Sequence, residues 1–275
     1  MFTWSRKSGS YRTLGFLPGM VIKNASRKAR LLPYQIFVIL FFLPLTCCGV
    51  AASYLASFFG PKGNLAHRCL TQWARLSLAL AGLRVEIAGK ERLDPKSTYI
   101  FMPNHASFLD ILLLLAYVPC DFRFIIKEEF FSVPLLGRTL ERSGDIPMDR
   151  KNPWKALRSL RRSAELLKEG ISVVVFPEGT RTSTGEIQEF KTALFILPVR
   201  TRIPVVPVLI EGTFDALKRG SVLLNPLPLK LIFHEPIEAD SCALKNRDIY
   251  ANKVRQVLSV RSYRENPSRA AERNS

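Results

Sequence analysis

The chain has 275 residues, 47% of them hydrophobic, which is enough to bury one good-sized core together with an appendage. Its formal net charge is +17, and residues 1–85 hold eleven lysines or arginines and no acidic residue. Such a balance suits nucleic acid or an anionic membrane surface. The 31 uncharged, mostly apolar residues between Arg30 and Lys62 argue against a nucleic-acid-binding arm and favour anionic membrane lipids as partners.

The N-terminal region is expected to have two parts that meet after Arg30. Residues 1–30 are polar and basic, with glycine and proline breaking any periodicity, so we expect a poorly ordered basic arm. The apolar run that follows is long enough to cross a bilayer core, which takes about 20 residues. Pro33 and Pro44 complicate a straight span, and a re-entrant or interfacial hairpin is an equally good interpretation.

A second helix is predicted over residues 65–83. Trp73 and the spacing of Arg68 and Arg75 make it amphipathic enough to lie at a membrane interface. The same pattern also suits the first core helix of a globular domain. With the apolar run, it defines a membrane-associated helical region over residues 31–83.

From residue 84 the pattern alternates between strands and helices, which is typical of an α/β fold. One helix is especially well marked, because Asn152 caps it, Pro153 takes its first position and Gly170 ends it. We place a globular domain at residues 84–260 and a disordered tail at residues 261–275. Strands are predicted at residues 84–88, 98–102, 122–126, 145–148, 171–176, 205–210 and 230–233.

A histidine and an aspartate five residues apart lie at one strand-to-helix junction. Residues 104–110 read Asn-His-Ala-Ser-Phe-Leu-Asp. If Ser107 caps the helix, Asp110 falls in its first turn and can hold one imidazole nitrogen of His105, leaving the other as a general base. The alternative is structural, because Ser107 and Asp110 also form a capping box beside a core histidine.

Other polar segments also follow predicted strands, at the edge where α/β sheets gather their ligands. Residues 176–181 read Phe-Pro-Glu-Gly-Thr-Arg, and residues 144–150 end in Arg150. Residues 203–208 are an apolar strand with two prolines, and Lys127 begins the stretch Lys-Glu-Glu-Phe-Phe-Ser-Val-Pro-Leu-Leu-Gly. The five cysteines lack metal-ligand spacing, so no metal site is predicted.

Four of these segments, in their order along the chain, resemble the motifs of the 1-acylglycerol-3-phosphate acyltransferase family: residues 104–110, 144–150, 176–181 and 203–208, with the stretch from Lys127 as a supporting match. The resemblance covers residues 85–210, and Phe190-Lys191 adds a further match. Pro147-Met148 and Ala193 depart from the family pattern, and both leave the lipid acceptor less well defined. The resemblance implies a mixed sheet flanked by helices, with an N-terminal region that inserts into the membrane.

The resemblance also implies the chemistry. The expected reaction moves an acyl group from acyl-CoA or acyl-carrier protein to the free hydroxyl of lysophosphatidic acid, giving phosphatidic acid, with no resident cofactor. In this reaction His105 would be the general base, and Asp110 would orient its imidazole. The implied acceptor-binding residues are Glu178, Gly179, Thr180, Arg181, Arg150 and Lys127, with the arginines on the phosphate.

Alternatives to this function remain at this stage. One keeps the reaction and changes the acceptor to another lysophospholipid or a lyso-aminolipid. Another is a catalytically silent membrane-binding relative, against which the intact His105 and Asp110 argue. Because the expected donors are cytoplasmic, we expect a hairpin or monotopic insertion at the cytoplasmic face of a membrane, the inner membrane if the source is bacterial.

Overall fold

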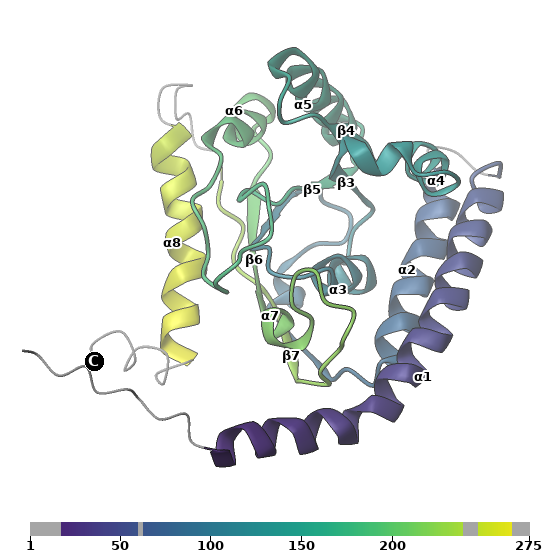
Figure 1. Ribbon diagram of the computed structural model, residues 1–275. Coiled ribbons are helices and arrows are strands. Elements are labelled where there is room, and N and C mark those ends of the chain that lie inside the picture. The colour runs from purple at the N-terminus through teal and green to yellow at the C-terminus, as the bar shows by residue number, and fades with distance from the viewer. Residues whose placement is uncertain (1–17, 60–62, 239–246, 266–275) are drawn as a thin grey trace, which may run out of the picture.

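A single mixed sheet of seven strands organises the computed structural model, which describes residues 18–59, 63–238 and 247–265 (Figure 1). The strand order is β1-β7-β6-β2-β5-β3-β4. The five strands from β6 to β4 are mutually parallel, whereas β7 runs antiparallel to β6 and parallel to β1. The predicted fold class is therefore confirmed. The strands are β1 Val85–Ala88, β2 Ile100–Pro103, β3 Phe122–Lys127, β4 Ile146–Met148, β5 Ser172–Val174, β6 Val205–Glu211 and β7 Leu229–Phe233, close to the seven predicted ranges.

Helices cover both faces of the sheet. One face packs against α2 and α3, and the other packs against α5, α6 and α8. The side chains of β2 show the alternation, since Phe101 belongs to the first core and its neighbours Ile100 and Met102 to the second. The helices are α1 Pro18–Ala56, α2 Asn64–Leu80, α3 Leu109–Tyr117, α4 Leu136–Ser143, α5 Pro153–Lys168, α6 Ile196–Thr201, α7 Thr213–Ala216 and α8 Arg247–Glu265, with 3-10 turns η2 Lys90–Arg92, η3 Glu128–Ser132 and η4 Thr192–Phe195.

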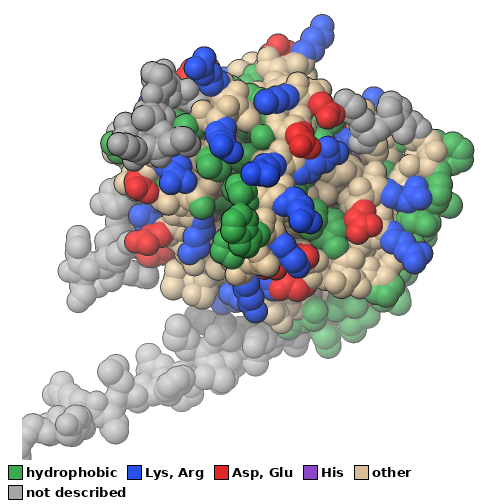
Figure 2. Space-filling view, turned by 90° about the horizontal axis from the view of Figure 1, so that it is seen from above, with side chains coloured by type: hydrophobic (Ala, Val, Ile, Leu, Met, Phe, Trp, Pro, Cys, Tyr) green, Lys and Arg blue, Asp and Glu red, His purple; other side chains and the backbone are tan. Residues whose placement is uncertain are grey.

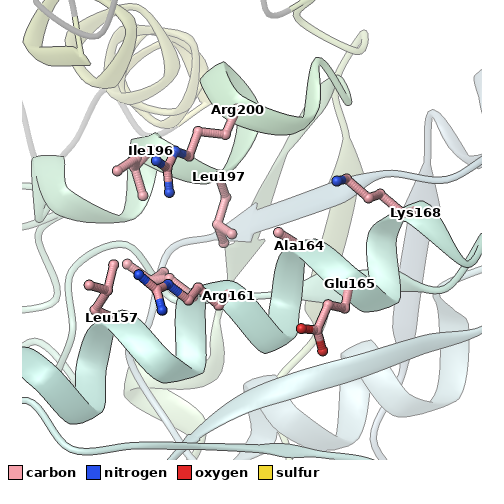
Figure 3. Close-up of a pocket in the computed structure, with 9 residues that line it drawn as sticks. Leu157, Arg161, Ala164, Glu165, Lys168, Ile196, Leu197 and Arg200 are labelled. Carbon is pink, nitrogen blue, oxygen red and sulfur yellow. The ribbon is translucent and has the colours of Figure 1, made fainter.

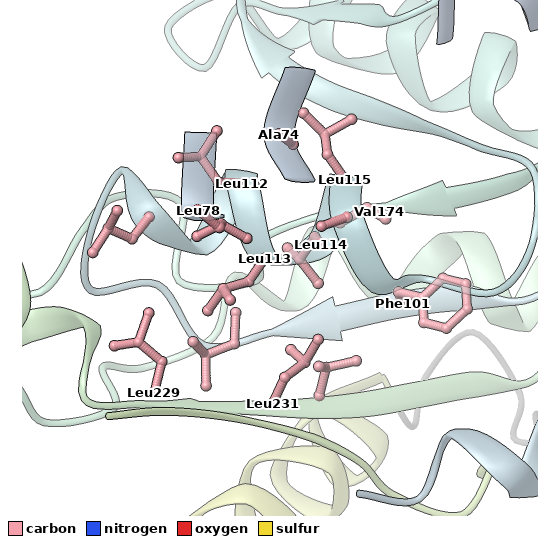
Figure 4. Close-up of a cluster of buried hydrophobic side chains, with 14 of the residues drawn as sticks. Ala74, Leu78, Phe101, Leu112, Leu113, Leu114, Leu115, Val174, Leu229 and Leu231 are labelled. Carbon is pink, nitrogen blue, oxygen red and sulfur yellow. The ribbon is translucent and has the colours of Figure 1, made fainter. Parts of the chain in front are cut away.

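Helix α3 lies at the centre of the first core. Its sequence is apolar all round, which suits a helix buried on every side. Figure 4 shows its leucines between α2 and the strands, and Leu113 and Leu114 have no exposed surface. Fully burying one such side chain stabilises the fold by roughly 1.5–3 kcal/mol. This packing holds the helix that begins beside His105 in one position.

Helix α5 has the bounds that its caps predict. The Asn152 side chain accepts hydrogen bonds from the backbone N–H groups of Trp154 and Lys155, and Gly170 follows the helix with φ +83°. Figure 2 shows the face of the molecule seen from above, where lysine and arginine side chains are spread among acidic ones. This mixture of opposite charges is typical of a solvent-exposed face.

Helices α1 and α2 pack antiparallel and together form a helical hairpin, so the chain reverses between the two helices and not within the apolar run. Three contacts follow its length: Tyr34 Oη donates to Ala81 O at 2.7 Å, Trp73 Nε1 to Thr46 Oγ1 at 3.3 Å and Ser53 Oγ to Ala66 O at 2.9 Å. Helix α2 also packs on α3 and buries one side of its surface. It is therefore a core helix of the globular domain, the second of the two interpretations of residues 65–83.

Helix α1 differs from the expectation in its extent. It continues through Pro33 and Pro44, so neither proline turns the apolar run back on itself, although Figure 1 shows a bend along the helix. It begins at Pro18, within the stretch expected to be a poorly ordered arm, and α8 likewise extends to Glu265, past the expected start of the tail. Residues 1–17 and 266–275 lie outside the described part of the chain.

One stretch of α1, Leu31–Ala56, is long and apolar enough to cross a membrane. Its 26 residues would span about 39 Å at the helical rise of about 1.5 Å per residue. Only 11% of its most apolar 18-residue window is buried in the protein, and Leu40 and Leu43 are more than 60% exposed. The outer side of α1 is thus an extended apolar surface.

Candidate active site

The predicted site residues gather at one edge of the sheet, because the strands that carry them are parallel neighbours. Strands β2, β5, β3 and β4 lie side by side, so their carboxyl ends meet at the same edge. His105 follows β2, residues 178–181 follow β5, Lys127 ends β3 and Arg150 follows β4. The sheet topology therefore brings together four segments that are far apart in the sequence.

His105 and Asp110 form the pair that their spacing predicts. His105 Nδ1 lies 2.9 Å from Asp110 Oδ2. The carboxylate is fully buried, whereas the imidazole keeps 14% of its surface exposed. With the Nδ1 proton donated to Asp110, Nε2 carries the free lone pair of the ring.

Asp110 also organises the backbone around the histidine. Its Oδ2 accepts hydrogen bonds from Ala106 N at 2.7 Å and Ser107 N at 2.8 Å. Helix α3 begins at Leu109, so Asp110 lies in its first turn, where a carboxylate is favoured. The aspartate therefore closes the loop that carries His105.

Ser107 does not cap α3 in the way expected. Its hydroxyl donates to Leu217 O at 2.7 Å, and the N-cap position is Phe108, which makes no capping hydrogen bond with its side chain. The Ser107 hydroxyl also accepts a long bond, 3.4 Å, from Leu109 N. Its main partner thus lies in a distant segment, so this serine ties the start of α3 to the loop after α7.

Packing against an aromatic ring orients the imidazole. The His105 ring stacks on Phe176, with ring centroids 3.8 Å apart and planes 20° from parallel. On the other side of β2, the Asn104 side-chain amide makes two hydrogen bonds to the Ile210 backbone, donating to its carbonyl at 2.9 Å and accepting from its N–H at 2.7 Å. These contacts leave the histidine little rotational freedom.

Glu178 faces inward, which differs from the expectation that it binds the acceptor. Its Oε1 accepts a hydrogen bond from His105 N at 2.8 Å, and its Oε2 accepts from Gln188 N and Nε2 at 3.1 and 3.0 Å. The residue is 3% exposed, and burial raises the pKa of its carboxyl, although these hydrogen bonds oppose the rise. Glu178 is therefore a positioning residue that joins two loops at the site.

Gly179 lies next to two cationic side chains, Lys191 and Arg150. Its φ is +77°, a conformation that favours glycine. A methyl group placed on it would lie 3.6 Å from Lys191 Cγ and 3.9 Å from Arg150 Nη1. Among the described residues, neither cation forms an ion pair with a carboxylate. Partial burial lowers the pKa of Arg150, although the nearby negative charge of Glu129 opposes this shift. Two unpaired cations at this point make a site for an anion.

The sequence did not predict that Lys191 lies beside Gly179, although the Phe190-Lys191 match marked its segment. It lies beyond the loop of residues 182–189, and Lys191 N donates to Pro177 O at 2.8 Å. This backbone contact brings the Lys191 segment back to the residues that follow β5, where its side chain lies beside Gly179. Gln188, which holds Glu178 and also donates to Thr180 O at 3.1 Å, was missed for the same reason.

The remaining predicted residues lie at the rim of the site. Lys127 Nζ pairs with Glu129 at 2.8 Å, with both side chains more than half exposed. Thr180 is exposed, and Arg181 is half-buried with its carbonyl accepting a 3.4 Å bond from Arg219 Nη1. Lys127 is thus partly neutralised, whereas Arg181 lies beside another cationic side chain.

A surface hollow of about 250 Å³ lies elsewhere, between α5 and α6 (Figure 3). Its lining combines apolar side chains with Arg161, Lys168 and Arg200, and it includes none of the predicted site residues. Among the residues that the structure describes, no group of three or more His, Cys, Asp or Glu side chains could hold a metal ion.

The chain is similar to known acyltransferases. Residues 84–211 match the family described as Acyltransferase. The chain is 33% identical to a chloroplastic 1-acyl-sn-glycerol-3-phosphate acyltransferase of Arabidopsis thaliana, over 73% of this chain and 55% of the relative. It is 32% identical to the 1-acyl-sn-glycerol-3-phosphate acyltransferase of Saccharomyces cerevisiae, over 82% of this chain and 76% of the relative. It thus spans about half the length of the plant relative and most of the yeast one.

A solved structure shows the same fold. The 1-acyl-sn-glycerophosphate acyltransferase of Thermotoga maritima superposes with a TM-score of 0.72 at 26% identity, covering 87% of this chain and 97% of that one. Sequence, fold and the His105–Asp110 pair agree, and the chain belongs to the 1-acyl-sn-glycerol-3-phosphate acyltransferase family.

Proposed function

We propose that this protein transfers an acyl group from a thioester, acyl-CoA or acyl-carrier protein, to the free hydroxyl of lysophosphatidic acid, and so forms phosphatidic acid. The observation that carries the proposal is the 2.9 Å pair of His105 Nδ1 and Asp110 Oδ2 at the edge of the sheet that also holds Arg150 and Lys191. A base and an anion site at one edge suit an acceptor that has both a hydroxyl and a phosphate.

The reaction follows from the state of the imidazole. His105 Nε2 removes the proton of the acceptor hydroxyl as its oxygen attacks the thioester carbonyl. Asp110, already bonded to Nδ1, stabilises the imidazolium that forms. When the tetrahedral intermediate collapses, the carbon–sulfur bond breaks and the imidazolium returns the proton to the thiolate. Atoms and charges balance without a covalent intermediate on the protein.

The acceptor phosphate is assigned to the cations around Gly179. Arg150 offers a planar fork that matches two phosphate oxygens, and Lys191 offers a point charge beside the same glycine. Arg181 follows two residues later. Since Glu178 uses its carboxylate to hold the His105 backbone, its inward orientation also keeps a negative charge away from the phosphate.

The apolar outer side of α1 supports action at a membrane, and we assign the domain to the cytoplasmic face because the expected thioester donors are cytoplasmic. Because α1 packs along α2, and α2 packs on α3, a full crossing by α1 would carry one wall of the globular domain into hydrocarbon. Monotopic insertion along the apolar side of Leu31–Ala56 avoids that cost. It also keeps the domain on the side of the membrane where it can meet the donors.

An acyl-transfer assay tests the proposal. The full-length protein is offered acyl-CoA and acyl-carrier protein in turn, against lysophosphatidic acid, other lysophospholipids and a lyso-aminolipid. We expect transfer to lysophosphatidic acid and a loss of about 10²–10⁴-fold in His105→Ala. Transfer to a different acceptor only would refute the assigned substrate, and near wild-type turnover by a folded His105→Ala would refute the mechanism.

A further inference from the structure

The segment between α7 and β7 exposes two large apolar side chains at its tip. We call residues 217–228 the mouth loop. Val222 is 72% exposed and Leu223 is 47% exposed, whereas the following Leu224 is only 6% exposed and packs in the core. Lys218 and Arg219 precede the tip and are also exposed. The tip thus combines two aliphatic side chains with two cations.

Hydrogen bonds give the mouth loop a defined shape. At its base, Asn225 N donates to Ala216 O at 2.8 Å and the Asn225 side chain donates to Asp215 O at 3.1 Å. At its tip, Ser221 N donates to Lys218 O at 3.0 Å, and Leu223 N donates to the Ser221 hydroxyl at 3.0 Å. The outward position of the apolar pair is therefore held by the backbone.

The mouth loop is bonded directly to the candidate active site. Ser107 Oγ, two residues from the catalytic histidine, donates to Leu217 O at 2.7 Å. Arg219 Nη1 donates to Arg181 O at 3.4 Å, in the segment assigned to the acceptor. Figure 1 shows this loop in green beside α3. A surface that engages the tip would therefore lie next to the segments that carry His105 and Arg181.

The mouth loop is also continuous with α1. Leu217, Leu224 and Leu227 pack in the same hydrophobic core as Val38 and Tyr34 of α1. The Tyr34 hydroxyl donates a hydrogen bond to the carbonyl of Ala81, at the end of α2 that leads into β1. The start of β1 lies beside the start of β7, where the mouth loop ends, because Leu229 N donates to Arg84 O at 2.8 Å. The end of α1 that carries Tyr34 and the base of the mouth loop therefore lie at the same end of the domain.

We propose that the tip of the mouth loop inserts into an anionic lipid bilayer, with Val222 and Leu223 among the acyl chains and Lys218 and Arg219 on the headgroups. The inference rests on the proposed function, and it adds a second lipid contact next to the catalytic base. Aliphatic side chains bordered by cations match the layering of an anionic membrane interface. The contact would let a lysolipid move from the bilayer to His105 without leaving lipid for water.

Two experiments on the full chain test the proposal. The first compares fluorescence of Val222→Trp and Ile249→Trp bound to phosphatidylcholine–phosphatidylglycerol vesicles, with and without acyl chains that carry bromine. Ile249 is the matched control, because it is 65% exposed on α8, which covers the other face of the sheet. After subtraction of the wild-type signal, we expect bromine to quench Val222→Trp and to leave Ile249→Trp unchanged.

The second experiment measures acceptor use by the V222D/L223D double variant and by I249D. We expect V222D/L223D to raise the KM for long-chain lysophosphatidic acid in vesicles by about tenfold or more, given the free energy of burying a Val and a Leu side chain. The KM for a short-chain, water-soluble lysophosphatidic acid should stay unchanged, and I249D should affect neither.

The outcomes separate the two proposals. Absence of quenching at position 222, or an equal rise of both KM values, would overturn lipid insertion by the mouth loop while leaving the acyl-transfer function standing. Failure of the wild type to acylate any lysolipid would refute the proposed function, but the quenching comparison does not need turnover and would still decide whether the tip enters the bilayer.

Discussion

Replacing Asp110 with asparagine would test the aspartate as the partner of the base, because it removes the charge and keeps the shape. An amide oxygen at the Oδ2 position can accept the same three hydrogen bonds, from His105 Nδ1, Ala106 N and Ser107 N. The amide nitrogen then takes the place of Oδ1, a buried atom without a hydrogen-bonding partner among the described residues. His105 therefore keeps its tautomer, and only the charge that faces the imidazolium is lost.

The expected loss of activity follows from the hydrogen bond to that imidazolium. A hydrogen bond to a charged group contributes about 1.5–3 kcal/mol, compared with about 0.5–1.5 kcal/mol for a neutral pair. The difference of about 1–2 kcal/mol corresponds to a fall of about 5- to 30-fold in kcat. A buried amide with unsatisfied donors should also lower the free energy of unfolding by about 1–3 kcal/mol.

A double-mutant cycle gives the assay. Rates of acyl transfer are measured for wild type, Asp110→Asn, His105→Ala and the double variant, with circular dichroism to show that each is folded. If Asp110 acts through His105, its replacement should change the residual rate of His105→Ala by about twofold at most. Were Asp110→Asn to cost the same factor in both backgrounds, the aspartate would affect the rate through the position of α3, and the reasoning about the imidazolium would fail.

Other predictions concern packing, pH and the anion site. A methyl group on Gly49 would lie 2.7–2.9 Å from Trp73, so Gly49→Val should lower the free energy of unfolding by about 1–3 kcal/mol in denaturant titrations, whereas Ala52→Val on the exposed side of α1 should not. The raised pKa of Glu178 means that the folded state holds the carboxyl proton more tightly than the unfolded chain does. The free energy of unfolding of the wild type should therefore fall relative to that of Glu178→Gln as the pH rises above 4.5. A free energy of unfolding that rises with pH relative to Glu178→Gln would contradict this. Lys191→Met keeps the stem and loses the charge, so the KM for lysophosphatidic acid should rise by about tenfold and that for the donor should change little; a rise confined to the donor would move Lys191 to the thioester side.

Much of the fold and the catalytic pair could be predicted from the sequence, because the signals are local. The seven strands follow from short apolar runs, and α5 follows from Asn152, Pro153 and Gly170. His105 and Asp110 are five residues apart across a strand-to-helix junction, so backbone geometry alone brings their side chains together. Residues so close along the chain need little from the rest of the protein to meet.

The tertiary structure decided what the remaining residues do. Glu178 turns toward the backbone of His105, 73 residues away, and Ser107 bonds Leu217, 110 residues away. Lys191 returns to Gly179 only because its segment is bonded to Pro177 after a loop. Likewise α2 is a core helix because α1 and α3 cover it, although its amphipathic pattern also suited a membrane interface. Local propensity carries no information about such partners, since a side chain can bond or bury itself only against whatever the sheet topology has brought beside it.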